Sequence, residues 1–263
     1  MNFINEVITS TIDIRDYQIN KVSNLPDTFT LDILPTVKNQ GSKPTCVAHA
    51  AASVIEYHYE KEHGNRRVFS TEFIYGFRDL FYYIGDGMMI RNALSTLKNY
   101  GDTFNTVCPG NNDYKEAMAT VEADLLTYLL EAEPHRVASY YRCKDVDDVK
   151  SALVCHGPVL VSMNTYKNAK IVNDVYTYDT NNESGRHCVM IYGWNEKGWL
   201  IQNSWGTSWA GDGRFILPFD YKFNEMWGIT DKEDTVNVKK PSKFKIAIHK
   251  LYNYIANLFI KED

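Results

Sequence analysis

The stretch TVKNQGSKPTCVAHAAASVIEY, residues 36–57, places a lone cysteine at the start of a long apolar run. After Cys46, small and apolar side chains recur at helical spacing, at Val47, Ala50, Ala51, Val54 and Tyr57. We therefore expect a helix of about 16 residues that begins at Cys46, with Thr45 or a neighbour as its cap. The positive end of a helix dipole stabilises a thiolate, which is the nucleophilic form of cysteine.

Composition limits what this thiol can do. The 263 residues are 44% hydrophobic and 23% charged, which is typical of a globular protein with a sizeable core. A formal net charge of -5 gives no electrostatic reason to expect a nucleic-acid partner. The five cysteines are widely spaced, without a C-x-x-C pair or a Cys/His cluster, so we expect no metal and no cofactor.

Targeting signals are not apparent in the sequence. The opening residues MNFINEVITSTIDIRDY lack the basic and apolar regions of a signal peptide, and no run approaches the roughly 18 apolar residues of a membrane span. We therefore expect a cytoplasmic location with reduced thiols. The alternative is a protein packaged in a virion or delivered without a classical signal peptide.

Helical patterns dominate the first half of the chain and strand patterns the second. Expected helices follow the first one at residues 70–83, 89–101, 113–133 and 145–157. Expected strands lie at residues 158–165, 187–195, 198–206 and 213–219. This order predicts an α+β protein with a helical lobe, a β lobe and a cleft between them.

A nucleophilic cysteine needs an imidazole, and that imidazole needs a polar group to orient it. His49 lies three residues after Cys46, but its helical side chain points along the helix rather than toward the cap, so we interpret it as structural. His187 stands at the entrance to an alternating strand, and Asn203 follows sixteen residues later at the end of the next expected strand. These two side chains can meet across adjacent strands and face Cys46 across the cleft.

Three blocks, VKNQGSKPTCVAHA, GRHCVMIYGW and QNSWGTSWAGDGRF, resemble the active-site motifs of papain-like (C1 type) cysteine peptidases. The resemblance covers about residues 25–230 and is strongest to bacterial and viral members without a full-length propeptide. It implies the papain-like two-lobe fold, with a helical left lobe, an antiparallel β right lobe and an active-site cleft between them.

The resemblance also implies a role for each matching residue. Cys46 would be the nucleophile, His187 its proton acceptor and donor, and Asn203 the group that orients the imidazole. Gln40, six residues before Cys46, would form the oxyanion hole together with the backbone N–H of Cys46. Trp205 would shield the bond between His187 and Asn203 from water.

The chain departs from the usual pattern near the nucleophile. Val47 stands where the family has an aromatic residue, and Lys43 replaces a cysteine that is usually in a disulfide. Cys188 follows His187 at a position that is usually small, so we expect it to narrow the S2 substrate pocket.

The segment GDGMM, residues 85–89, occupies about the place of the family's glycine-rich substrate-binding stretch. The resemblance implies that Gly85 and Gly87 line the substrate-binding site and that the backbone of Gly87 forms hydrogen bonds with the substrate. Met88 or Met89 would form an apolar wall of the S2 pocket. The alternative for this segment is a turn that simply leads into a helix.

Two terminal segments extend beyond the matching region. Residues 1–24, with DIRDY at 13–17, resemble short arms in related bacterial and viral sequences, so we expect an arm that lies over or near the cleft and restrains activity; the alternative is an arm that only packs on the surface. Residues 231–263 read as an extension with an amphipathic helix, which either docks on its own domain or contacts a partner protein or a membrane surface. Oligomeric state is left open.

The sequence thus predicts a cysteine endopeptidase that hydrolyses protein or peptide substrates through a thioester acyl-enzyme. Two alternatives remain. One is another acyl transfer on the same residues, as in an exopeptidase, deamidase or isopeptidase. The other is a catalytically silent, protein-binding relative.

Overall fold

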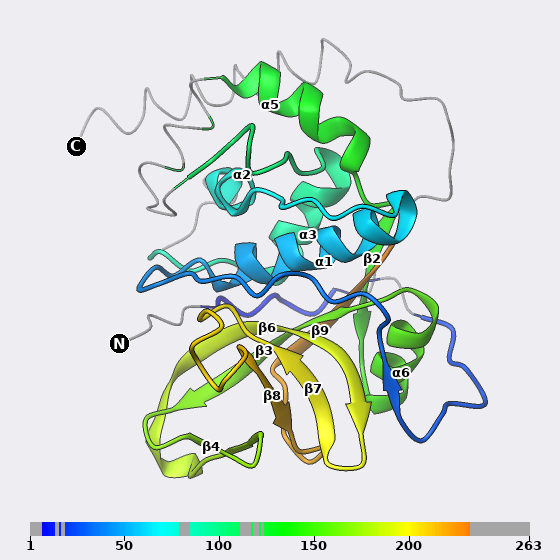
Figure 1. The fold of residues 1–263 in the computed structure, drawn as a ribbon, viewed down its shortest axis with the longest axis vertical. Helices are drawn as coiled ribbons and strands as arrows, with labels where there is room; N and C mark the ends of the chain where they lie inside the picture. Colours follow the sequence, from blue (N-terminus) through cyan, green and yellow to red (C-terminus); the bar gives the residue numbers. More distant parts are fainter. Residues whose placement is uncertain are drawn as a thin grey trace.

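The computed structural model describes residues 7–13, 16, 19–78, 85–110, 117, 121 and 124–231. Helices α1, α2, α3 and α5 gather in one lobe and the strands in the other, where α6 packs on the sheet, and this confirms the expected α+β class (Figure 1). The expected C-terminal extension, residues 231–263, lies outside the described residues apart from Asp231, and its amphipathic helix lies wholly outside them. Parts of the expected helices at residues 70–83 and 113–133 also lie outside them.

The helices follow the expected order. They are α1 (Cys46–His63), α2 (Thr71–Gly76), α3 (Ile90–Asn99), α5 (Leu125–Ala132) and α6 (Val146–Cys155), with short 3-10 turns η2 (Glu133–His135) and η3 (Thr180–Asn182). Helix α1 begins at Cys46 and ends where Gly64 takes a left-handed conformation with φ 67°. Pro134 stands in η2, directly after the end of α5, because proline lacks the N–H that would continue the helix.

One mixed, mostly antiparallel sheet carries the second lobe. Its strands are β1 (Phe29–Thr30), β2 (Ser139–Cys143), β3 (Val159–Tyr166), β4 (Lys170–Val172), β5 (Val175–Thr177), β6 (Glu183–Asn195), β7 (Gly198–Gln202), β8 (Arg214–Leu217) and β9 (Glu225–Thr230). The order is β2-β9-β3-β6-β7-β8-β5-β4, with β1 added to β6, and only the β5–β8 pair is parallel among the described strands. Five strands, β1, β2, β4, β5 and β9, were not predicted.

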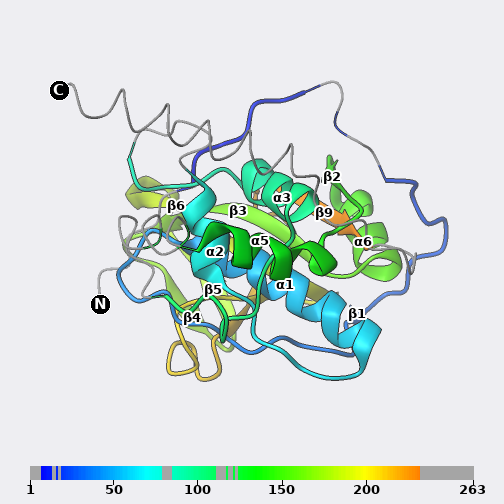
Figure 2. The ribbon, with the colours of Figure 1, turned by 90° about the horizontal axis from the view of Figure 1, so that it is seen from above.

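Helix α1 is the central element of the molecule. Its first thirteen residues, from Cys46 to His58, are all buried, as expected of a helix that is covered on every side. Ala48, Ala51 and Ala52 are fully buried in one cluster with residues of β3, β6 and β9. Small side chains let the helix lie close over the sheet, and Figure 2 shows α1 crossing the strands from above. This packing fixes Cys46 against the second lobe.

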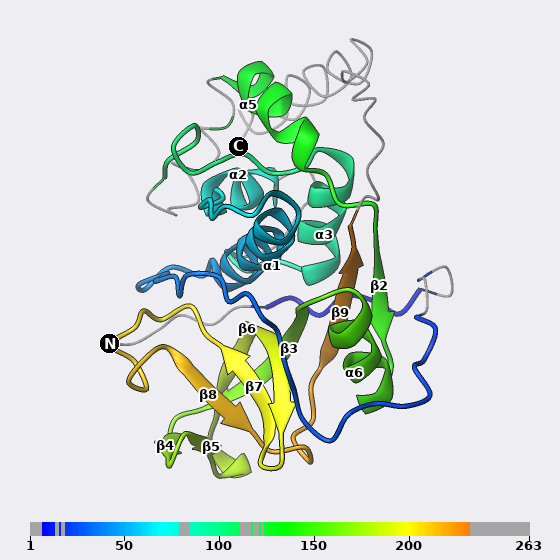
Figure 3. The same cartoon turned by 45° about the vertical axis from the view of Figure 1, so that its right-hand side comes forward.

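The N-terminal arm runs between the two lobes, as the dark-blue segment in Figures 1 and 3 shows. Val7 forms a parallel β-bridge with Met88, and the N–H of Ile8 donates to the carbonyl of Met88 at 3.1 Å. Val7 is buried in the same cluster as Cys46, Met88 and Cys188. No helix in the described part of the chain is long and apolar enough to cross a membrane.

Candidate active site

Three elements converge where the lobes meet. Cys46 is the first residue of α1, His187 lies on β6, and Asn203 directly follows β7. Strands β6 and β7 pair antiparallel, with Met190 opposite Gln202, so His187 and Asn203 reach the same edge of the sheet. His187 lies inside β6, which begins at Glu183, rather than at the entrance to the strand. The strand is longer than its apolar pattern because its exposed first residues pair with β3.

His187 and Asn203 are joined by a hydrogen bond of 2.7 Å between Nε2 and Oδ1. The N–H of Ser204 also donates to the same Oδ1, at 2.7 Å, which fixes the orientation of the amide. Because a carbonyl oxygen only accepts, Nε2 of His187 must carry the proton. The neutral ring therefore presents the lone pair of Nδ1, which is buried and has no hydrogen-bond partner among the described residues.

The surroundings of the imidazole keep water away from it. His187 is 1% exposed, and its ring stacks on Trp205 with centroids 4.6 Å apart and an interplanar angle of 20°. Burial lowers the pKa of His187 to about 4, although the hydrogen bond to Asn203 opposes the shift. The ring is therefore neutral near pH 7 while the site is covered. Cys46, at the same lobe boundary, is fully buried.

Gln40 is fixed by the turn that follows Asn203. Its Oε1 accepts from Ser204 Oγ at 2.7 Å, and its backbone N–H donates to the carbonyl of Ser204 at 2.8 Å. Its Nε2 donates to the carbonyl of Lys43 at 2.9 Å. An amide nitrogen carries two hydrogens, so the second remains for another acceptor. The N–H of Cys46, as the first residue of α1, is likewise not used by the helix's own bonding ladder.

His49 is part of the helix start. Its Nδ1 lies 2.9 Å from the carbonyl of Thr45, the cap residue, whose side chain makes no capping hydrogen bond. Burial is the main cause that lowers the pKa of His49 to about 4; the hydrogen bond to Thr45 opposes the shift, and the positive charge of Lys38 adds to it. His49 thus lies near the site and binds back to its own helix, as expected of a structural histidine.

The predicted substrate-binding segment has a different internal arrangement from the expected one. Arg78 donates to the carbonyls of Gly85 and Gly87, the latter at 3.0 Å. Met88, rather than Gly87, offers the carbonyl that pairs with an extended chain. Its side chain is fully buried beside that of Cys188 in the cluster described above. Met89 caps the N-terminus of α3.

The arm makes polar contacts along the same boundary. Arg186, beside His187, donates to Thr9 Oγ1 at 2.6 Å. The N–H of Ser10 donates to Oε1 of Glu225 at 3.3 Å, and the side chain of Glu225 is fully buried. No sequence signal identified Glu225, because it lies on a strand without an alternating pattern. Within the described residues, no three His, Cys, Asp or Glu side chains lie close enough together to hold a metal ion.

Comparisons with known proteins show the family to which the chain belongs. A family model described as "Papain family cysteine protease" matches residues 27–234. An uncharacterized peptidase C1-like protein of Acanthamoeba polyphaga mimivirus is 28% identical, over 86% of this chain and 79% of that protein. A viral cathepsin of Adoxophyes honmai nucleopolyhedrovirus is 23% identical over 73% of this chain, and the match spans 56% of that protein.

A similar fold is found among solved structures. Xylellain, a cysteine protease from Xylella fastidiosa, superposes with a TM-score of 0.77 at 22% identity, over 87% of this chain and 96% of that one. At this level of identity the likeness shows the fold alone.

Proposed function

Because the chain belongs to the papain family of cysteine proteases, we propose that it is an endopeptidase that works through Cys46, His187 and Asn203. The observation that carries the proposal is the hydrogen bond from His187 Nε2 to Asn203, which leaves Nδ1 to take a proton. In the first step, the thiol proton of Cys46 passes to Nδ1, and the sulfur attacks the carbonyl carbon of a peptide bond.

The negative charge then develops on the former carbonyl oxygen. The second Nε2 hydrogen of Gln40 and the backbone N–H of Cys46 are the donors that stabilise it, each worth on the order of 3 kcal/mol in such sites. Ser204 holds the Gln40 amide from its oxygen side, so the donor is positioned before substrate arrives. Water exclusion by Trp205 strengthens these interactions.

The leaving group departs when the imidazolium of His187 returns its proton to the amine nitrogen and the C–N bond breaks. The product is a thioester on Cys46. His187 then takes a proton from water, the hydroxide adds to the thioester carbon, and the C–S bond breaks to release the acid. The bond to Asn203 keeps Nδ1 directed at the reaction in both halves.

Attack within a chain is favoured over attack at a chain end. The boundary between the lobes holds Val7, Ile8, Thr9 and Ser10 as a continuous extended segment that contacts residues of both lobes. A groove that accepts the interior of a polypeptide suits an endopeptidase better than an exopeptidase. The presence of Cys46, His187, Asn203 and Gln40 together argues against a silent relative.

Peptide hydrolysis tests the assignment directly. Cys46→Ser and His187→Ala are expected to reduce kcat/KM on a fluorogenic peptide mixture by at least about 1,000-fold, because both groups form bonds to the reacting atoms. Cys155→Ser is the matched control, since this exposed thiol lies outside the site. Unchanged turnover in Cys46→Ser would contradict the proposed mechanism.

We further propose that the arm restrains the enzyme. Its contacts with Met88, Arg186 and Glu225 lie on both lobes, and Cys46 and His187 are 0% and 1% exposed beneath this boundary. In this proposal an extended substrate binds by a hydrogen bond to the Met88 carbonyl, which already accepts the N–H of Ile8 from the arm. Displacement of the arm would also rehydrate His187 and raise its pKa, which favours the thiolate–imidazolium pair.

Two equivalent substitutions on the arm separate restraint from surface packing. Val7→Asp places a charge at a position that is 6% exposed, whereas Ser23→Asp does so at an exposed position of the arm. Burial of a valine side chain is worth about 1.5–3 kcal/mol, so Val7→Asp is expected to raise kcat/KM at least about tenfold. Ser23→Asp is expected to change kcat/KM little. Equal activities of the two variants would remove the restraint proposal.

A further inference from the structure

Two arginines from different lobes meet over one indole ring. Arg91 is on α3 and Arg142 on β2, and Arg142 is the direct cross-strand partner of Trp227 on β9. The guanidinium carbons lie 4.7 Å and 5.2 Å from the Trp227 ring centroid. Aromatic faces attract guanidinium groups, so the indole is a platform that keeps the two cations in place.

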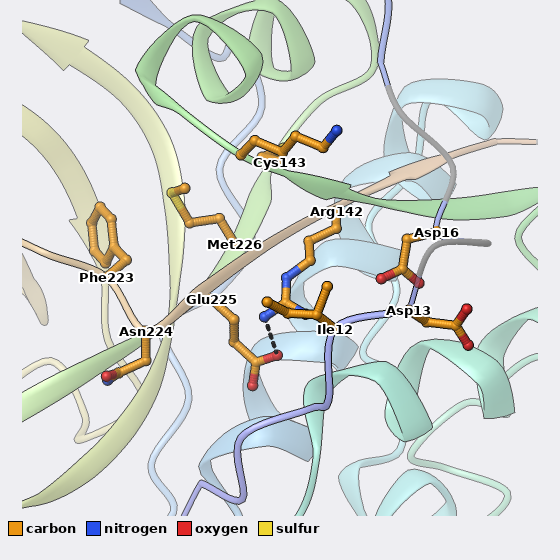
Figure 4. Close-up of a pocket in the computed structure, with 10 residues that line it drawn as sticks. Ile12, Asp13, Asp16, Arg142, Cys143, Phe223, Asn224, Glu225 and Met226 are labelled. Atoms are coloured by element: carbon orange, nitrogen blue, oxygen red, sulfur yellow. Dashed lines mark ion pairs between the residues drawn. The ribbon is translucent and has the colours of Figure 1, made fainter.

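Glu225 balances only one of these charges. Its Oε2 accepts from Trp227 Nε1 at 2.8 Å and lies 3.8 Å from Nη2 of Arg142, an ion pair that Figure 4 shows. Without the arm, two guanidinium charges would face the single carboxylate of Glu225. A net positive charge would remain on the side of Arg91, which is only 19% exposed.

The arm supplies the missing carboxylate. Both oxygens of Asp16 bind the guanidinium of Arg91, one of them at 2.7 Å, in the two-pronged geometry that suits arginine and carboxylate. The carbonyl of Thr11 accepts from Arg91 at 2.8 Å and from Arg142 at 3.4 Å. The hydrogen bond to Asp16 raises the pKa of Arg91.

The site has room beside the arm. A pocket of about 550 Å³ lies between the arm, β2 and β9, with Asp13, Asp16, Arg142, Lys144 and Glu225 among its lining residues (Figure 4). Its walls thus carry charged side chains of both signs, and they also include apolar ones, such as Phe223 and Met226. A chain other than the arm can therefore enter from this side without rearrangement of the sheet.

We propose that Arg91 and Arg142, held on Trp227, form a binding site for an acidic side chain of the peptide substrate, and that Asp16 occupies this site in the uncut arm. The inference rests on the proposed peptidase function. Contacts to the Thr11 carbonyl and the Ser10 N–H select a polypeptide, because a free carboxylate lacks both groups. Substrates with a suitably placed aspartate or glutamate displace the arm from its anchor and are cut preferentially.

A binding experiment tests the site without turnover. The protein is the full chain with Cys46→Ser, Val7→Asp and Asp16→Asn, so that it cannot cleave and its own arm is released from the Met88 carbonyl and from the arginine pair. The probe is a fluorescent peptide VITSTIDIRD, the sequence of residues 7–16, with a blocked C-terminus. A second probe has asparagine in place of its last aspartate, and fluorescence anisotropy measures both.

We expect the aspartate peptide to bind about tenfold more tightly than the asparagine peptide, as a charge-assisted pair predicts. Adding Arg91→Gln should remove the difference, and Arg91→Lys should retain part of it, because lysine keeps the charge without the fork. Arg66→Gln is the matched control, since Arg66 pairs with Glu60 at another surface. Equal affinity of the two peptides, no binding of either, or a preference that survives Arg91→Gln would overturn the proposal.

Measurements of peptide cleavage distinguish the proposed carboxylate-binding site from the proposed peptidase function. The enzyme is the Asp16→Asn variant with Cys46 intact, and the substrates are a library of fluorescence-quenched peptides. The library contains pairs of peptides that differ only in having aspartate or asparagine at one position, and kcat/KM is compared within each pair. We expect a kcat/KM ratio of about ten for some pairs, falling toward one with Arg91→Gln. Binding preference without cleavage of any peptide would refute the peptidase and keep the carboxylate site. Cleavage without an aspartate preference would refute the carboxylate site alone.

Discussion

The imidazole of His187 has a defined tautomer and orientation. Ser204 donates its N–H to Asn203 Oδ1, so the amide oxygen faces His187 and the ring must donate from Nε2. This arrangement gives Nδ1 the task of moving protons to and from Cys46. The sequence predicted that His187 and Asn203 meet across adjacent strands. It did not predict the contribution of Ser204, because a serine after an asparagine carries no pattern of its own.

Asn203→Ala tests the role of this fixed tautomer and orientation in catalysis. Without the amide oxygen, the ring loses its fixed tautomer and orientation, and kcat is expected to fall about 100-fold with a smaller change in KM. Initial rates of peptide hydrolysis over a range of substrate concentrations give both kcat and KM. Asn195→Ala, at the turn between β6 and β7, is the matched control and should be neutral for kcat. A loss in Asn195→Ala as large as in Asn203→Ala would point to the stability of the sheet instead.

At the scale of elements, α1 positions the nucleophile by close packing. Ala51 is fully buried in the cluster that joins α1 to the sheet. Ala51→Leu is expected to lower the free energy of unfolding by about 1–3 kcal/mol, because the extra volume forces the helix away from the sheet. Urea denaturation measures the change. Ala138→Leu, at an exposed position, should lie within about 0.5 kcal/mol of the unsubstituted protein.

Long and regular elements could be predicted from the sequence, and the short pairing strands could not. Helix α1 has its expected start, and β3, β6, β7 and β8 overlap their predicted ranges. Strands β2 and β9 were missed because they are short, mix aromatic and polar residues, and pair with each other across a large sequence separation. These two strands carry Arg142, Glu225 and Trp227. Because the strands were not predicted, the proposed site for an acidic side chain could not be predicted from the sequence either.

The arm was assigned by resemblance rather than by pattern. Its contacts are made by backbone groups and by polar side chains, such as Ile8 N–H and Asp16, which leave no apolar period in the sequence. Likewise, the carbonyl of Met88 rather than that of Gly87 meets the arm, since Arg78 already binds Gly87. Such choices depend on distant partners and are visible only in the folded chain.

At the scale of the whole molecule, two buried histidines link stability to pH. Burial lowers the pKa of both His49 and His187 to about 4, from the ordinary value of 6.5. Between these pH values the unfolded chain binds more protons than the folded one, so the free energy of unfolding falls as the pH falls. The contribution is complete above pH 6.5 and amounts to about 3 kcal/mol per histidine.

Urea denaturation between pH 4 and pH 7 measures this effect. His49→Gln is expected to reduce the pH-dependent loss of stability by about 3 kcal/mol, because the variant has one buried imidazole fewer. Asn65→Gln, at an exposed position just after α1, should leave the pH profile unchanged, because it removes no titratable group. Identical profiles for His49→Gln and the unsubstituted protein would contradict the assigned shift.

The arm and the catalytic residues form one system across the two lobes, and one measurement addresses both. The rate of alkylation of Cys46 by iodoacetamide at pH 7 is followed by peptide mass spectrometry, with the exposed Cys155 as the reference in the same molecule. We predict that Val7→Asp accelerates labelling of Cys46 at least about tenfold relative to Cys155, and that adding His187→Ala abolishes the gain. Labelling of Cys46 at the same rate relative to Cys155 in all three proteins would contradict an arm-covered, histidine-activated nucleophile.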